Sequence, residues 1–211
     1  MKHIIKHPEP QEFIHWKTRF PAATYADLRQ EQQFSGATKA LLTLRDSLAS
    51  EQGYLCCYCE SLIDNGNFHI EHFRPKCVGK FPHLQLTYNN LLACCHKTPI
   101  GGTDECCGHK KSNIFDNDLI SPLSSDCESH FQYNMAGKVL STDGSGKKTI
   151  TLLNLNSTLL IRKRKDLIEY FEDLEEEEYD KEVIKHLNSS NCPLGEFYTT
   201  IKYLHNQRLL H

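Results

Sequence analysis

The chain has 211 residues, of which 39% are hydrophobic and 24% are charged, and its formal net charge is −3. This length suits one domain of ordinary size, or a small core with helical additions. No apolar run of about 18 residues occurs, and the start of the chain has no apolar secretory segment, so neither a membrane span nor a secretory signal is expected. We therefore expect a cytoplasmic protein, in which the ten cysteines are reduced and a subset of them binds metal.

The first third of the chain is predicted to contain a helix followed by a turn and a short strand. Prolines interrupt any long helix before residue 36, whereas residues 36–52 have a helical pattern of leucines and alanines that ends at Gly53. Residues 54–63 are typical of a hairpin or zinc knuckle, and 64–67 give a strong turn signal. Residues 68–73 then alternate as a strand, with Phe68, Ile70 and His72 on one face and His69, Glu71 and Phe73 on the other.

The rest of the chain is predicted to be loop-rich and then helical. Residues 84–95 form a short helix or turn that leads into a cysteine pair, and 96–105 form a loop. Residues 112–148 are poor in strands, with turns at 135–138 and 143–146. A helical region is predicted from Thr149, and Ser157 suits an N-cap.

Charge is unevenly distributed along the chain. Acidic residues concentrate in 169–182, and basic residues concentrate in 74–80, 110–111, 147–148 and 162–165. The negative total argues against indiscriminate binding of nucleic acid, but it is compatible with a local basic surface.

The cysteine spacing predicts a zinc site. The backbone between Cys56 and Cys59 can turn so that both thiolates reach one ion, whereas Cys57 with Cys59 makes a poorer chelate. Structural zinc is four-coordinate, so two further ligands are needed. They are expected from one member each of the pairs Cys94-Cys95 and Cys106-Cys107, and spacing does not decide within either pair. The alternative is that these cysteines are small buried hydrophobic residues.

A catalytic site is predicted around His72. Neutral imidazole suits the deprotonation of water, and a hard cation such as Mg²⁺ or Mn²⁺ suits the negative charge that builds on a phosphate during hydrolysis. Glu71 is a candidate ligand for that cation, although an ideal strand directs it away from His72. A later ligand is expected from His109 or Asn113. The alternative is that His69 and His72 are half-buried polar residues of a strand.

These motifs resemble the HNH, or ββα-metal, endonuclease superfamily over roughly residues 54–113. The resemblance implies an α+β fold in which a small zinc-stapled ββα-metal core, residues 54–118, is embedded between a helical extension, 1–53, and a loop-rich and then helical region, 119–211. The matching segments are Cys56-x-x-Cys59, Ile70-Glu71-His72-Phe73-x-Pro75, Asn90-Leu91-Leu92-x-x-Cys95 and Cys107-x-His109-x-Lys111.

The resemblance also implies roles for individual residues. Glu71 binds the catalytic metal, His72 is the base, and Asn90 belongs to the catalytic motif, where it ties a loop through backbone hydrogen bonds. A glycine-rich loop stretches the third motif, so the last metal ligand stays open between His109 and Asn113. The implied zinc ligands are Cys56, Cys59, Cys95 and Cys107, which leaves Cys77, Cys127 and Cys192 as bystanders.

Over nearly the whole chain the sequence is similar to the HNH subunit of Septu anti-phage defence, which is related to subunits of some retron cassettes. The similar segments are Met1-Lys2-His3-Ile4, Tyr58-Cys59-Glu60, His69 to Lys76 and Cys107 to Lys111. This resemblance implies a partner, an ABC-type ATPase of the same defence system that controls the nuclease. The acidic residues 169–182 are then either a surface for that partner or a solvated helix face.

We therefore predict a metal-dependent endonuclease that hydrolyses phosphodiester bonds of nucleic acid, DNA rather than RNA, as the effector subunit of an anti-phage complex. Basic side chains near the site are expected to contact the nucleic-acid backbone. A non-catalytic zinc-stapled module that binds nucleic acid or protein is the main alternative, and a disulfide-rich extracellular protein is a third. The predicted backbone contacts are Arg74, Lys76, Lys110 and Lys111.

Overall fold

The computed structural model describes residues 1–63, 66–96, 98–188, 190 and 193–207, which form an α+β protein. Seven α-helices and two small antiparallel sheets lie in these residues. The elements are α1 (Gln11–Arg19), α2 (Ala37–Glu51), β1 (Phe68–His72), β2 (Leu91–Cys95), α3 (Cys107–Lys111), β3 (Gln132–Tyr133), β4 (Val139–Leu140), α4 (Gly144–Leu152), α5 (Thr158–Glu172), α6 (Glu176–Leu187) and α7 (Tyr198–Asn206).

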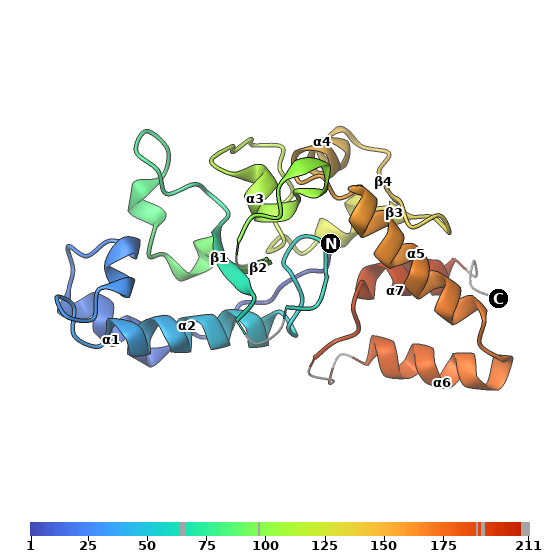
Figure 1. Ribbon diagram of the computed structural model, residues 1–211, viewed down its shortest axis with the longest axis horizontal. Coiled ribbons are helices and arrows are strands. Elements are labelled where there is room, and N and C mark those ends of the chain that lie inside the picture. The colour runs from blue at the N-terminus through green and yellow to red at the C-terminus, as the bar shows by residue number, and fades with distance from the viewer. Residues whose placement is uncertain (64–65, 97, 189, 191–192, 208–211) are drawn as a thin grey trace.

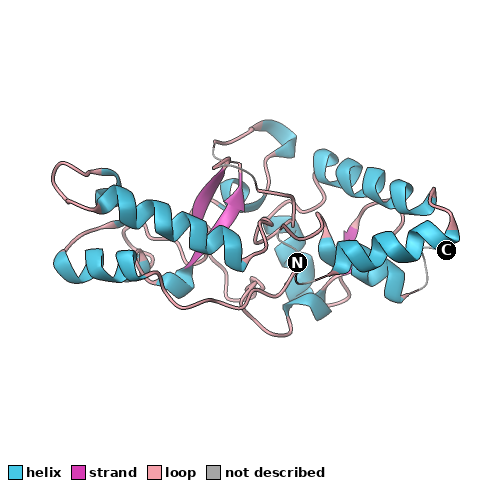
Figure 2. Ribbon diagram, turned by 90° about the horizontal axis from the view of Figure 1, so that it is seen from below, coloured by secondary structure: helices cyan, strands magenta, loops and turns pink. Residues whose placement is uncertain are grey.

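The elements follow one another along an elongated molecule. Helices α1 and α2 lie at one end, the β1–β2 pair lies in the middle near α3, and α5, α6 and α7 lie at the other end (Figure 1). Figure 2 shows the same succession from below. One hydrophobic cluster nevertheless includes Leu44 of α2, Leu92 of β2 and Phe171 of α5. No helix in the described part of the chain has the length and apolar character needed to cross a bilayer.

The helix predicted over residues 36–52 is α2. Its buried face is formed by Ala40, Leu44 and Leu48, which are spaced at the helical period. Leu42, one of the leucines of the helical pattern, is 54% exposed. The reason is geometric, because two residues correspond to about 200° of rotation and place Leu42 opposite Leu44. Gly53, the predicted stop, has φ +63 just beyond the end of the helix.

The central sheet positions the candidate catalytic residues of the middle segment. Strand β1 forms where alternation predicted it, and it pairs antiparallel with β2 so that His69 lies opposite Cys94 and Glu71 lies opposite Leu92. The sequence did not predict β2, because every residue of Leu91–Cys95 is buried and the segment therefore shows no alternation. The register places His69, Glu71 and Cys94 on the same face of the sheet.

In the described part of the C-terminal half, one small hairpin is followed by four α-helices. The predicted turn at 135–138 joins β3 to β4. The turn predicted at 143–146 is instead the start of α4, where the Asp143 side chain accepts a hydrogen bond from the Gly146 amide at 2.7 Å. The predicted N-cap is confirmed at α5, since the Ser157 hydroxyl accepts from the Leu160 amide at 3.3 Å.

Arg164 differs from its basic neighbours in residues 162–165, because it is only 1% exposed. Its Nη1 donates to the Gly137 carbonyl at 2.6 Å and its Nη2 donates to the Leu155 carbonyl. The guanidinium lies 5.6 Å from the centre of the Phe197 ring. Arg164 therefore fastens α5 to the β3–β4 turn and to the start of α7.

Replacing Arg164 with methionine is expected to lower the free energy of unfolding by about 2–4 kcal/mol, because two charge-assisted hydrogen bonds are lost. Urea denaturation followed by circular dichroism measures this change. The matched control is Arg162→Met on an exposed face of the same helix, where we expect a change within about 0.5 kcal/mol. Equal effects of the two substitutions would contradict the anchoring role.

Candidate active site

A cleft of about 340 Å³ opens where β1 ends and α3 begins. It is lined by side chains from both elements and from the loops that follow them. The structure therefore brings together the predicted metal ligands, the predicted base and one predicted phosphate contact. The lining residues used below are His69, Glu71, His72, Lys76, Gly108, His109 and Asn113.

Glu71 is buried, and its two carboxylate oxygens have different surroundings. Oε1 accepts from the Lys111 ammonium at 2.8 Å and from the Tyr58 hydroxyl at 3.2 Å. Oε2 lies 3.6 Å from His69 Nε2. Burial alone would raise the pKa of Glu71, but His69 and Lys111 outweigh burial and lower it. Glu71 is therefore an ionised carboxylate with Oε2 available beside an imidazole.

The imidazoles of His69 and His109 lie side by side, with ring centres 4.2 Å apart. His69 Nδ1 and His109 Nε2 lie 2.8 and 3.0 Å from the same acceptor, the backbone carbonyl of His96. A carbonyl only accepts hydrogen bonds, so these two nitrogens carry protons. His69 Nε2 and His109 Nδ1 are the nitrogens left for a metal.

His69 was not among the metal ligands predicted from the sequence. The alternation of β1 had already placed it on the face of Glu71, and that pattern was the available signal. Burial works against a charge on His69, but Cys94 and Glu71 outweigh it and raise the pKa of His69 to about 11. A divalent cation at Nε2 would displace the proton that these anions hold there.

His72 lies on the opposite face of β1 from Glu71 and still lines the cleft, because the strand ends at this residue. Its Nε2 lies 3.0 Å from the Gln85 carbonyl, which fixes the proton on Nε2 and leaves Nδ1 as the acceptor. The Tyr25 ring packs edge-on against the imidazole of His72, with the two ring centres 4.6 Å apart. Burial and the charge of Lys76 lower the pKa of His72 to about 4, so the ring is neutral at pH 7.

Asn90 does not line the cleft but fastens the loop that follows β1. Its side chain accepts from the Arg74 amide at 2.8 Å and donates to the carbonyls of Arg74 and Leu84 at 3.0 and 3.2 Å. These hydrogen bonds to the protein backbone are of the kind predicted for Asn90 from the sequence. Asn90 is thus placed to hold Arg74 and the adjoining loop beside the cleft.

The four side chains that were predicted to contact the nucleic-acid backbone differ in their exposure to solvent. Lys110 and Arg74 are exposed, and so is Lys76, which lines the cleft. Lys111 is fully buried, and its ammonium donates to Glu71 and, at 3.2 Å, to the His72 carbonyl. A phosphate cannot reach a side chain enclosed in this way, so the assignment of Lys111 to the backbone contacts is corrected to a contact that holds Glu71.

Gly108 lets α3 approach β1 closely enough to form the cleft. A Cβ atom on Gly108 would lie 2.5 Å from His69 Nε2 and 2.7 Å from Glu71 Oε2. Gly108→Ala is therefore expected to displace both groups and to lower the rate of the predicted nucleic-acid cleavage by at least about 10²-fold. Cleavage kinetics measure the effect, with Gly144→Ala as the control, because nothing lies within 4 Å of a Cβ at that position. An unchanged rate in Gly108→Ala would exclude this close approach.

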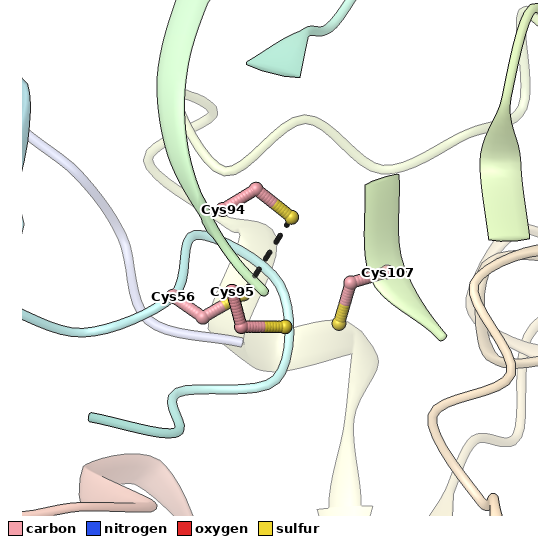
Figure 3. Close-up of side chains that lie close together, drawn as sticks. All are labelled: Cys56, Cys94, Cys95 and Cys107. Carbon is pink, nitrogen blue, oxygen red and sulfur yellow. Dashed lines mark hydrogen bonds between the residues drawn. The ribbon is translucent and has the colours of Figure 1, made fainter. Parts of the chain in front are cut away.

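A cluster of buried thiols lies behind the cleft. Residues 54–63, predicted as a hairpin or zinc knuckle, form a turn in which the Cys56 amide donates to the Ser61 carbonyl at 2.9 Å. The Cys57 amide joins this turn to β2 by donating to the Ala93 carbonyl at 3.0 Å. The Sγ atoms of one group of four all lie within 4.8 Å of one another (Figure 3). That group consists of Cys56, Cys94, Cys95 and Cys107.

Cys59, the fourth predicted ligand, lies at the edge of this group. Its Sγ is 3.8 Å from that of Cys95, and it also interacts with Cys56 and Cys107. The Sγ atoms of Cys56 and Cys94 are 3.8 Å apart as well. A tetrahedral zinc ion with Zn–S bonds of about 2.3 Å requires sulfurs about 3.8 Å apart. The sequence predicted one ligand from the Cys94-Cys95 pair, but both members lie in the group, so Cys94 and Cys59 are alternative candidates for a fourth position.

Two curated proteins are similar to this chain, whereas no protein-family model matches it. One is an Escherichia coli protein named as the HNH endonuclease of retron Ec83. It is 30% identical over 216 residues, which cover 81% of this chain and 80% of that protein. A protein of Vibrio cholerae serotype O1 biovar El Tor, named for the HNH endonuclease of retron Vc95, is 34% identical over 144 residues, covering 64% and 67%.

The cleft with its candidate catalytic residues and these two relatives together define the class of the protein. The chain belongs to the HNH endonuclease superfamily, as its motifs predicted, and it is an endonuclease. Its relatives connect it to retrons, which the sequence resemblance also indicated.

Proposed function

We propose that this endonuclease hydrolyses phosphodiester bonds of nucleic acid, DNA rather than RNA, with a divalent cation held in the cleft. The observation that carries the proposal is the convergence of Glu71 Oε2, His69 Nε2 and His109 at the point where His72 also lines the cleft. A carboxylate oxygen with imidazole nitrogens suits a catalytic divalent ion, and Mg²⁺ or Mn²⁺ are the expected ions. Asn113, exposed at the cleft, is the alternative to His109 as the last ligand.

In the proposed mechanism His72 is the general base. Its Nε2 proton is engaged by the Gln85 carbonyl, so Nδ1 accepts the proton of the attacking water. A cation bound at Glu71 would stabilise the charge that develops on the phosphate oxygens. Lys111 and Tyr58 hold Oε1 of Glu71 and so direct Oε2 toward the cleft.

The proposed contacts to the nucleic-acid backbone are Arg74, Lys76 and Lys110. Arg74 lies 5.4 Å from the centre of the Phe81 ring and 5.5 Å from that of Phe115, which restricts its position near the cleft. Contacts of this kind give affinity that depends on salt and little on sequence.

We also propose a structural zinc ion in the thiol cluster, on Cys56, Cys95 and Cys107 with either Cys59 or Cys94. In this proposal residues 54–118 are a zinc-stapled ββα-metal core made of β1, β2 and α3. Residues 1–53 and 119–211 are its extensions. The acidic residues 169–182, which include the exposed Glu176 at the start of α6, are the proposed contact with an ABC-type ATPase of the same cytoplasmic defence system.

The test is cleavage of plasmid DNA and of a tRNA pool, each with and without the co-encoded ATPase. We expect DNA to be cut, EDTA to stop the reaction, and Mg²⁺ or Mn²⁺ to restore it. His109→Ala should raise the metal concentration for half-maximal activity about 10- to 100-fold, whereas Asn113→Ala should change it little.

Each other outcome revises a defined part of the proposal. Cleavage of tRNA alone would correct the substrate. A large effect of Asn113→Ala with none of His109→Ala would exchange the two as ligands. No cleavage in any combination would favour the non-catalytic binding module.

A further inference from the structure

A second group of metal-binding side chains lies next to the four-thiol group. The Sγ atoms of Cys95 and Cys106 and a ring nitrogen of His96 lie within 4.8 Å of one another. Cys95 and Cys106 are buried and His96 is half-buried, so the group is not a chance cluster on an exposed surface. Cys95 belongs to both groups.

The backbone at this group is held in an uncommon conformation. His96 has φ +60 and Cys107 has φ +57, although neither is glycine. Each left-handed residue costs about 1–2 kcal/mol, and such residues persist where the surrounding structure fixes them, often at functional sites. One of them provides the imidazole of the second group, and the other directly follows Cys106.

We propose that Cys95, His96 and Cys106 bind a second zinc ion, so that the Cys95 thiolate is shared between two ions. This inference rests on the proposed first zinc only for the shared thiolate. Two thiolates and one imidazole are a donor set typical of zinc, and a water molecule can fill the fourth position.

Charge favours the second ion as well. A Zn²⁺ ion with four thiolates has a net charge of about −2, and an excess buried charge is costly unless it is compensated. A second Zn²⁺ ion on the shared thiolate, with Cys106 as a further thiolate, reduces that excess. It also gives the buried Cys106 a partner other than neighbouring thiols.

The second ion would act on the cleft through His96. The His96 carbonyl accepts hydrogen bonds from His69 and His109 and so orients both imidazoles. A metal on the His96 side chain fixes the residue that carries this carbonyl. His96 is then a positioning residue that connects the thiol cluster to the candidate active site.

The experiment measures the number of zinc ions per full-length chain by elemental mass spectrometry. The protein is first dialysed against excess Mg²⁺, so that Mg²⁺ rather than zinc occupies the cleft. We expect two zinc ions in the wild type and one in Cys106→Ser and in His96→Ala. Cys127→Ser is the matched control, because Cys127 is also fully buried but its Sγ contacts the backbone carbonyls of Met1 and Pro122, and it should keep two.

The possible results separate this inference from the proposed structural zinc. One ion in the wild type, retained in Cys106→Ser, would overturn the second site and leave the first. No ion in the wild type would overturn both. Two ions in the wild type and in both variants would place the second ion elsewhere and also overturn the inference. Should Cys106→Ser fail to fold by circular dichroism, His96→Ala and the wild-type count decide.

Discussion

Replacing His72 with alanine is expected to lower the rate of nucleic-acid cleavage about 10²- to 10⁴-fold, which is the contribution of a positioned general base. His72 is 5% exposed and lies at the end of β1, with its Nε2 engaged by Gln85 at 3.0 Å. Only Nδ1 remains to accept a proton from water. The rate is measured at saturating Mg²⁺ or Mn²⁺ with the partner ATPase present, and zinc content and thermal stability are measured on the same sample.

Two further variants make the His72 result specific. His72→Asn keeps a polar amide near the position of Nδ1 but has no basic nitrogen, so it should be as inactive as the alanine variant. His15→Ala changes an exposed histidine of α1 and should cut at the wild-type rate. Cleavage retained in His72→Asn would assign the base to another group, and cleavage retained in both His72 variants would indicate a contaminating nuclease.

The sequence predicted local features of the site well. Alternation placed β1 and its two faces, the hairpin or knuckle predicted over residues 54–63 is a local turn, and the position of Ser157 predicted an N-cap that the structure contains. Each of these depends on residues that are close together in the chain. The family followed from the same local motifs, and the two relatives confirm it.

The features that were missed depend on pairing between distant segments. The pairing of β1 with β2 places Cys94 opposite His69, on the face of the sheet that carries Glu71, and no local pattern contains that register. Burial of Lys111 likewise depends on how α3 packs on the sheet. The sequence showed only two adjacent lysines, which by themselves favour a surface.

Lys111 and Glu71 form the second position where a large effect is expected. Lys111 is 0% exposed, and its ammonium is 2.8 Å from Glu71 Oε1. Lys111→Met leaves Oε1 of the buried carboxylate without its ammonium partner, so the free energy of unfolding should fall by about 3–5 kcal/mol. Adding Glu71→Gln should recover most of this loss, because the amide is neutral and its oxygen still accepts from Tyr58. The double variant should not cleave, since the proposed metal ligand is gone.

Urea denaturation of the wild type, both single variants and the double variant gives the coupling energy between the two residues. Lys110→Met is the matched control, because Lys110 is the exposed neighbour in α3 and its loss should change stability by less than about 0.5 kcal/mol. Loss of a contact to the nucleic-acid backbone has a different signature. The slope of the logarithm of the nucleic-acid binding constant against the logarithm of salt concentration decreases in magnitude by about one. We expect that signature for Lys110→Met, whereas finding it for Lys111→Met without any loss of stability would return Lys111 to the nucleic-acid surface.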